Sequence, residues 1–250
     1  MADKENAICW ICGTNPATTR EHLVKKSDLA AIFRKGNDGG RFYFNDEKRR
    51  DKIVQGLGAD ILKSPVKICG NCNSARTQPH DLAWASMSNW FRTNPEKMRP
   101  GDVIRLNRIF PHDTRRHMLN VHLYFAKLFG GMIKEDEHKE GGEKIPIELQ
   151  PFADAIIGNR AHREMFLQFG LGDGTVGRSS INCRIREDRK FVIAHWVHRI
   201  GAVAVNVLFL QEGEEWRNLD TAWHPKHNFK TFRVVDTRTD LAEMANAADG

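Results

Sequence analysis

Two Cys-x-x-Cys pairs constrain the fold of this chain more than any other feature of its sequence. They are Cys9-Trp10-Ile11-Cys12 and Cys69-Gly70-Asn71-Cys72, and 56 residues separate Cys12 from Cys69. Four thiolates arranged in two such pairs are typical of a tetrahedral structural zinc site. A shared Zn²⁺ ion would fix two distant segments to each other and organise the first part of the chain. The spacing alone leaves open whether the site is a zinc ribbon or a treble clef.

The composition is that of an ordinary folded protein. Of its 250 residues, 40% are hydrophobic, which is sufficient for a buried core. The first residues contain no apolar signal segment, and no stretch approaches the roughly 20 apolar residues of a membrane span. Four of the five cysteines lie in the pairs, which favours metal binding in a reducing, cytoplasmic compartment over a disulfide framework. For the fifth, Cys183, a strand-like context predicts a plain core thiol.

The charge of the chain favours a polyanionic partner. The formal net charge is +6, and residues 1–80 contain 14 Lys or Arg against 9 Asp or Glu. Most of the positive excess therefore lies in the part of the sequence that holds the cysteine pairs. Residues 134–143 are the opposite case, an acidic, glycine-containing run for which we predict a solvated loop without a function.

Periodicity and turn residues predict an α+β chain in two parts. Helical spacing of apolar residues indicates helices over 27–33, 82–91 and 119–129, with Ser27 or Asp28 as the N-cap of the first. Residues 41–45 and 49–55 fit an inserted basic hairpin, and an antiparallel sheet is expected from the strand-like segments 165–169, 180–185, 191–197 and 202–210. Prolines and a glycine within 93–101 favour a boundary between domains 1–95 and 96–250, although the stretch also fits a loop.

Three polar residues accompany the cysteine pairs. Glu21 and His22 lie between the pairs, and Asn73 follows the last cysteine directly. The order CxxC, Glu-His, CxxC-Asn resembles the zinc-containing branch of the HNH endonucleases. The resemblance covers roughly residues 8 to 90 and is carried by residues 8–13, 19–27 and 65–74. It implies a zinc-stabilised treble-clef or ββα-metal module, followed in this chain by an α+β region with the antiparallel sheet.

The resemblance also implies roles for these residues. His22 matches the general base of the family, because an imidazole can be neutral at pH 7 and accept a proton from water. Glu21 and Asn73 would bind one catalytic divalent cation, Mg²⁺ or another, which would stabilise the leaving oxygen of a phosphodiester in nucleic acid, most simply DNA. Lys25 and Lys26 follow His22 closely and are candidates for neutralising the flanking phosphates, with a plain solvated surface as the alternative. The family position whose asparagine orients the histidine falls on Ser64 here, so a backbone carbonyl or another side chain must take that task.

Simpler interpretations remain open. A zinc-stabilised module that binds nucleic acid or protein without catalysis would show the same cysteines, and the region after residue 95 would select the substrate or a protein partner. Residues 172–177 fit the spacing GxGxxG, but strand-like sequence follows, which predicts a glycine turn and no nucleotide cofactor. Structural roles are expected for the histidine pairs His195 with His198 and His224 with His227.

Overall fold

The chain folds into a mixed α+β structure. The computed structural model describes residues 7–33, 42–46, 49–139, 144–188, 190–216 and 219–236. Its α-helices are α1 (Lys26–Phe33), α2 (Gln78–Thr93), α3 (Thr114–Glu137) and α4 (Gln150–Ile157). The three helices predicted over 27–33, 82–91 and 119–129 are confirmed as α1, α2 and α3. No helix within the described ranges is both long enough and apolar enough to cross a lipid bilayer.

A seven-stranded mixed sheet forms the centre of the molecule. Its strands are β5 (Val103–Arg105), β6 (Met165–Leu171), β7 (Val176–Arg178), β8 (Asn182–Ile185), β9 (Phe191–Ile200), β10 (Val203–Leu210) and β11 (Thr231–Asp236). The order is β5-β11-β6-β10-β9-β7, and β8 also pairs with β9. The predicted antiparallel pairing holds for β6, β10, β9 and β8. The sheet as a whole is not antiparallel, because β11 runs parallel to β6.

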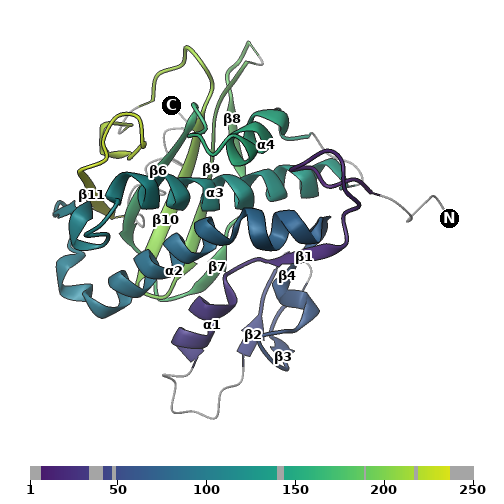
Figure 1. The fold of residues 1–250 in the computed structure, drawn as a ribbon, viewed down its shortest axis with the longest axis horizontal. Coiled ribbons are helices and arrows are strands. Elements are labelled where there is room, and N and C mark those ends of the chain that lie inside the picture. Colours follow the sequence, from purple (N-terminus) through teal and green to yellow (C-terminus); the bar gives the residue numbers. More distant parts are fainter. Residues whose placement is uncertain are drawn as a thin grey trace.

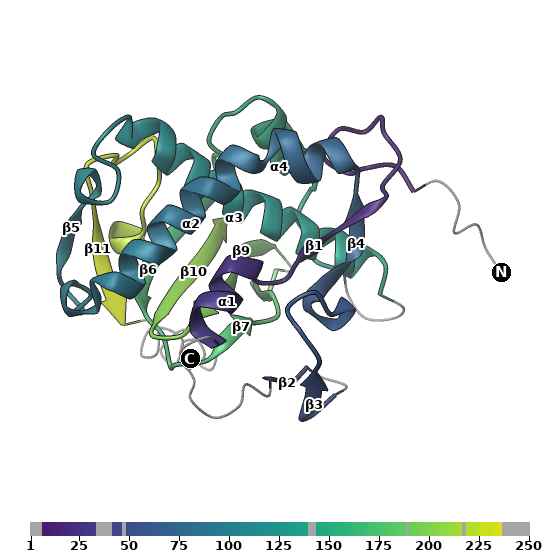
Figure 2. The same ribbon diagram turned by 60° about the horizontal axis from the view of Figure 1, so that its bottom comes forward.

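Two smaller strand pairs lie outside this sheet. Strand β1 (Thr19–His22) pairs antiparallel with β4 (Lys63–Ile68), and the chain enters α2 shortly after β4. Between them, β2 (Phe42–Phe44) and β3 (Lys52–Val54) form the predicted hairpin in its described residues. Figure 2 shows this hairpin projecting from the body of the molecule.

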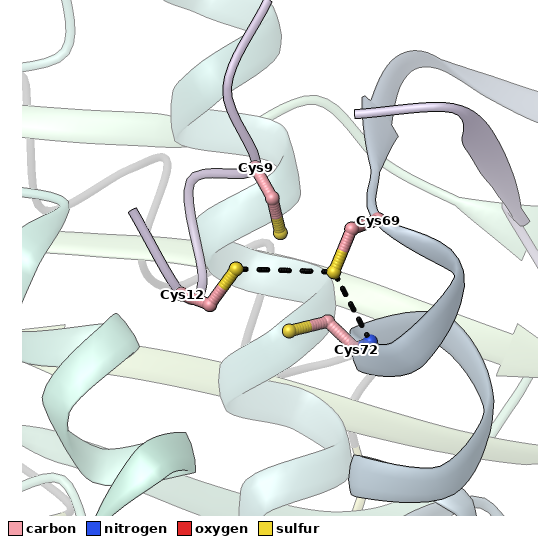
Figure 3. A group of neighbouring side chains, drawn as sticks. All are labelled: Cys9, Cys12, Cys69 and Cys72. Atoms are coloured by element: carbon pink, nitrogen blue, oxygen red, sulfur yellow. Dashed lines mark hydrogen bonds between the residues drawn. The ribbon is translucent and has the colours of Figure 1, made fainter. Parts of the chain in front are cut away.

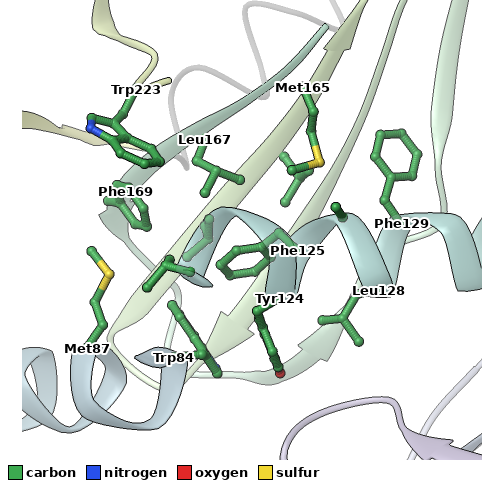
Figure 4. Close-up of a cluster of buried hydrophobic side chains, with 14 of the residues drawn as sticks. Trp84, Met87, Tyr124, Phe125, Leu128, Phe129, Met165, Leu167, Phe169 and Trp223 are labelled. Atoms are coloured by element: carbon green, nitrogen blue, oxygen red, sulfur yellow. The ribbon is translucent and has the colours of Figure 1, made fainter. Parts of the chain in front are cut away.

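Helices α2 and α3 lie side by side over one face of the large sheet (Figure 1). Their inward side chains build an aromatic core: Trp84 packs edge-on against Phe125 with ring centroids 4.8 Å apart, and Phe125 lies against Trp196 of β9. Figure 4 shows this cluster between α3 and the strands. One continuous buried cluster thus contains residues from both sides of residue 95.

Helix α1 is attached to α2 through one buried carboxylate. Asp28 has no exposed surface and accepts hydrogen bonds from Trp84 Nε1, Ser88 Oγ and Arg92 Nη1, at 2.9, 2.7 and 2.6 Å. Because the helix begins at Lys26, both residues predicted as its N-cap, Ser27 and Asp28, lie inside it, and that prediction is wrong. The carboxylate of Asp28 instead binds side chains of α2, a long-range contact that the neighbouring sequence does not predict.

Two further sequence predictions are wrong. Cys183 is exposed, because β8 pairs with β9 at the margin of the sheet. Residues 134–137 are not loop but the last turn of α3, since Met132 and Ile133 continue its buried face and Glu135 pairs with Arg178. For residues 245–250 the sequence predicts a frayed tail, but these residues lie outside the described ranges.

Candidate metal centre and the adjacent pocket

The two cysteine pairs come together from separate segments. The first pair lies in a tight turn, in which the Gly13 amide donates to Cys9 O at 2.8 Å and Gly13 adopts a φ of 65°, a conformation that favours glycine. The second pair follows β4, and Cys72 begins a single π-helical turn, Cys72–Arg76. The pairing of β1 with β4 brings this turn next to the first loop (Figure 3).

The geometry of the sulfurs suits a closed tetrahedral metal site. All four Sγ atoms lie within 4.8 Å of one another, and Cys12 Sγ is 3.8 Å from Cys69 Sγ. A tetrahedron with Zn–S bonds of about 2.3 Å requires sulfurs about 3.8 Å apart. Cys69 Sγ also accepts from the Cys72 amide at 3.4 Å and from Asn15 Nδ2 at 3.9 Å, donors that stabilise a thiolate. Cys9, Cys12, Cys69 and Cys72 are therefore compatible with a structural zinc.

The pKa values of the thiols make metal binding at this site depend on pH. Burial raises the pKa of Cys9. Burial also raises the pKa of Cys72, and the neighbouring thiols of Cys69 and Cys9 raise it further. Burial also acts to raise the pKa of Cys12, but hydrogen bonds from Thr14 and the Asn15 amide lower it to about 6. A bound cation must therefore displace protons from at least two buried thiols, so metal affinity falls in acid.

A small pocket adjoins the cysteine site. Its polar lining consists of Glu21, His22, Ser64, Lys127 and Arg178, and its volume is about 30 Å³, which is room for about two water molecules. Successive residues of a regular strand point to opposite faces. The register of β1 against β4 shifts between Arg20 and His22, and this irregularity lets the consecutive residues Glu21 and His22 line one pocket.

A backbone carbonyl orients the ring of His22. Nε2 of His22 lies 3.1 Å from Leu57 O. A neutral imidazole can bind this oxygen only as the Nε2–H tautomer, which leaves Nδ1 unprotonated. No described residue forms a hydrogen bond with that Nδ1. Among the described hydrogen bonds, the hydroxyl of Ser64 donates to Glu135 Oε1 at 2.5 Å and not to the ring of His22. The Leu57 carbonyl thus holds the ring where the sequence offers no asparagine.

Glu21 is held by a buried lysine. Nζ of Lys127, on α3, lies 2.9 Å from Glu21 Oε2, 2.9 Å from Asp81 Oδ1 and 3.3 Å from Thr77 Oγ1. Lys127 is 3% exposed. Burial acts to lower its pKa, but Glu21 and Asp81 outweigh burial and raise it. The cation beside Glu21 in this structure is therefore an ammonium group of the chain itself.

The remaining predicted site residues lie nearby without joining this network. Asn73 is half-buried in the π-helical turn, where its backbone N–H donates to Cys69 O at 3.0 Å. Among the described contacts, its side chain binds neither Glu21 nor His22. Lys25 and the exposed Lys26 lie where α1 begins, and neither forms an ion pair with a described carboxylate. In the described ranges, only the four cysteines form a group of three or more His, Cys, Asp or Glu able to hold a metal ion.

Sequence reasoning missed Lys127, Arg178 and Leu57. A signal for Lys127 exists, because it is a single charge between Phe125 and Phe129 on an otherwise apolar stretch. Such a lysine must be buried with a carboxylate, but the sequence does not say which one. Arg178 and Leu57 carry no comparable signal.

Loss of the Lys127 ammonium should destabilise the protein. In Lys127→Met, the half-buried carboxylates of Glu21 and Asp81 lose their partner, and we expect the free energy of unfolding to fall by about 3 kcal/mol. Urea denaturation measures this change. The matched variant Lys134→Met removes an exposed pair with Glu137 on the same helix and should cost less than about 0.5 kcal/mol. Equal midpoints for the two variants would refute the buried network.

The structure also shows where the other motifs of the sequence lie. Residues 172–175 form the predicted glycine turn from β6 to β7, and the last two positions of the GxGxxG match, Val176 and Gly177, belong to β7. His198 is completely buried among the core aromatic rings, and the rings of His224 and His227 lie 5.0 Å apart. Comparison of the chain with protein-family models, curated proteins and solved structures gave no match. Functional assignment therefore rests on the site itself.

Proposed function

We propose that residues 7–93 form a treble-clef-like HNH module, ordered by zinc, that hydrolyses phosphodiester bonds in nucleic acid, with DNA as the first candidate substrate. The order of elements supports this proposal: a cysteine loop, the antiparallel pair β1–β4, and a second cysteine pair that leads into α2. The free cysteines fit a reducing, cytoplasmic compartment.

The observation that carries the proposal is the fixed orientation of His22. With Nε2 bound to Leu57 O, the unprotonated Nδ1 is available to accept a proton from water in or beside the pocket. Lys127 engages Oε2 of Glu21, so Oε1 is the oxygen that we assign, with Asn73, to a catalytic divalent cation such as Mg²⁺. When bound, that cation would neutralise charge on the phosphate and the leaving oxygen. Lys25 and Lys26 would contact flanking phosphates.

The second candidate is a zinc-stabilised module that binds nucleic acid or protein without catalysis. The ion pair between Lys127 and Glu21 favours it, because an ammonium already satisfies the carboxylate that the nuclease needs for its metal. The two candidates differ in one measurable respect, the dependence of strand cleavage on His22.

Plasmid nicking tests the nuclease. Wild type is expected to nick supercoiled DNA with Mg²⁺, Mn²⁺ or Ni²⁺, and His22→Ala should lose at least 100-fold in rate at equal zinc content, which is the usual contribution of a general base. His112→Ala, which alters an exposed histidine outside the pocket, is the matched control and should keep full activity. Equal rates for wild type and His22→Ala, or no cleavage of DNA or RNA with any metal, would leave the binding module as the function.

A further inference from the structure

An exposed aromatic ring, that of Phe229, lies just before β11, and exposed cations are frequent on β11, on the paired β5 and at the start of α3. We name this region the Phe229 surface. Phe229 is 39% exposed. Its cations, all exposed, are Arg105, Arg108, Arg115, Arg116, Lys226, Lys230 and Arg233. In Figure 2, β5 and β11 lie at one end of the molecule and β1 and β4 toward the other.

Strand register places two of these arginines on one face. In the antiparallel pair β5–β11, Arg105 is opposite Thr231 and Arg233 is opposite Val103. Opposed residues share a face, and so do residues two apart on one strand. Arg105 and Arg233 therefore point outward together, while the intervening Ile104 and Phe232 are buried.

Further contacts tie Arg115 and Lys230 to the segment that carries the ring. The Arg115 guanidinium lies 5.1 Å from the centroid of Phe229. The backbone of Lys230 is joined to β5, because the Leu106 amide donates to Lys230 O at 2.8 Å. Asn228 Oδ1 accepts from the Lys230 amide at 2.9 Å and so fixes the turn that presents Phe229.

The charge of this surface is largely uncompensated. Among described residues, only Arg116 of the seven cations forms an ion pair, with Asp113 at 3.9 Å. The cations of the pocket differ, since Lys127 and Arg178 are both paired with carboxylates at less than 3 Å. Uncompensated surface cations attract a polyanion, and arginine, which supplies five of the seven, matches the geometry of phosphate oxygens.

We propose that the Phe229 surface binds a single strand of nucleic acid, with phosphates against the arginines and lysines and an unpaired base against Phe229. An exposed ring among cations is the combination that single-strand binding proteins use, because every base has an aromatic face. This inference does not depend on hydrolysis at His22. If both hold, the surface retains part of the substrate at a distance from the cleavage site.

Fluorescence anisotropy with a labelled oligothymidine of about 20 nucleotides tests the proposal without added divalent metal. The double variant Arg105→Gln/Arg233→Gln should bind about tenfold more weakly at low salt, and the slope of log K against log salt should fall by about 1.4, since each phosphate contact contributes about 0.7 on a single strand. Phe229→Leu should weaken binding about fivefold with an unchanged slope. Circular dichroism confirms that each variant is folded.

A matched control separates the surface from net charge. Lys139→Gln/Lys190→Gln also removes two exposed cations, with side chains 63% and 71% exposed in weak pairs elsewhere, and should bind like wild type. His22→Ala should also bind like wild type, so failure of the nuclease proposal and of this one are distinguishable. Wild-type binding by the arginine variant overturns the proposal. So does equally strong binding of polyglutamate, or tight binding of duplex alone with no effect of Phe229→Leu.

Discussion

Cys72→Ser is expected to lose bound zinc and to unfold residues 7–93. Apparent zinc binding free energies in four-ligand sites are on the order of 10 kcal/mol. The whole stability of a domain is about 5–15 kcal/mol, so no other single change in this chain should cost as much. Metal analysis and thermal unfolding followed by circular dichroism measure both consequences.

The loss should extend beyond the ligands, because the zinc loop is packed onto the helices. The Trp10 side chain lies directly against Gly130 of α3, where even a methyl group would collide with the indole. Ile156 of α4 belongs to the same buried cluster as Cys9 and Cys72. Release of the loop therefore exposes apolar surface on α3 and α4, and the large sheet should melt at a lower temperature as well.

The fifth cysteine provides the matched control for this prediction. Cys183→Ser makes the same chemical change at an exposed position on β8 and should alter neither zinc content nor melting temperature. A Cys72→Ser variant with the zinc content and melting temperature of wild type would remove the structural metal site and, with it, the basis for the treble-clef proposal.

The parts of the fold that the sequence predicts are those with local causes. Residue spacing identifies the cysteine pairs, and their convergence follows because a shared tetrahedral ion needs all four thiolates. Apolar periodicity predicts α2 and α3, and dense β-branched sequence predicts β9 and β10. Each of these features depends on residues close together in the chain.

The parts that escaped prediction depend on long-range pairing. Lys127 meets Glu21 across 106 residues, and the sequence offers no rule that selects this carboxylate among many. The parallel pairing of β11 with β6 is set by the route of the intervening chain, which periodicity does not encode. The Phe229 surface has the same origin, because its cations come from two segments more than 100 residues apart that β5 and β11 join. Charge counted along the sequence pointed only to the cysteine region.

Buried histidines make acid strongly destabilising. Burial lowers the pKa of His162, His198 and His224 to about 4, from an ordinary value of 6.5. His198 is fully buried, and neither ring nitrogen has a hydrogen-bond partner in the described structure. As the pH falls below 6.5, the unfolded chain binds protons that the folded chain excludes. The contribution of these neutral histidines to the free energy of unfolding is therefore fully present above pH 6.5 and is lost as the pH falls towards 4.

For His198, the expected loss at about pH 5 is roughly 2 kcal/mol, by the linkage between pKa and unfolding. Urea denaturation at about pH 7.5 and pH 5, with bound zinc assayed at both, measures it and separates it from metal loss. His198→Leu places a side chain that does not titrate at the same buried position, so the loss of stability between the two pH values should be about 2 kcal/mol smaller than in wild type. The same substitution at the exposed His112 should leave that loss unchanged. Identical unfolding free energies at the two pH values with zinc retained would show that these rings gain access to protons in the folded state.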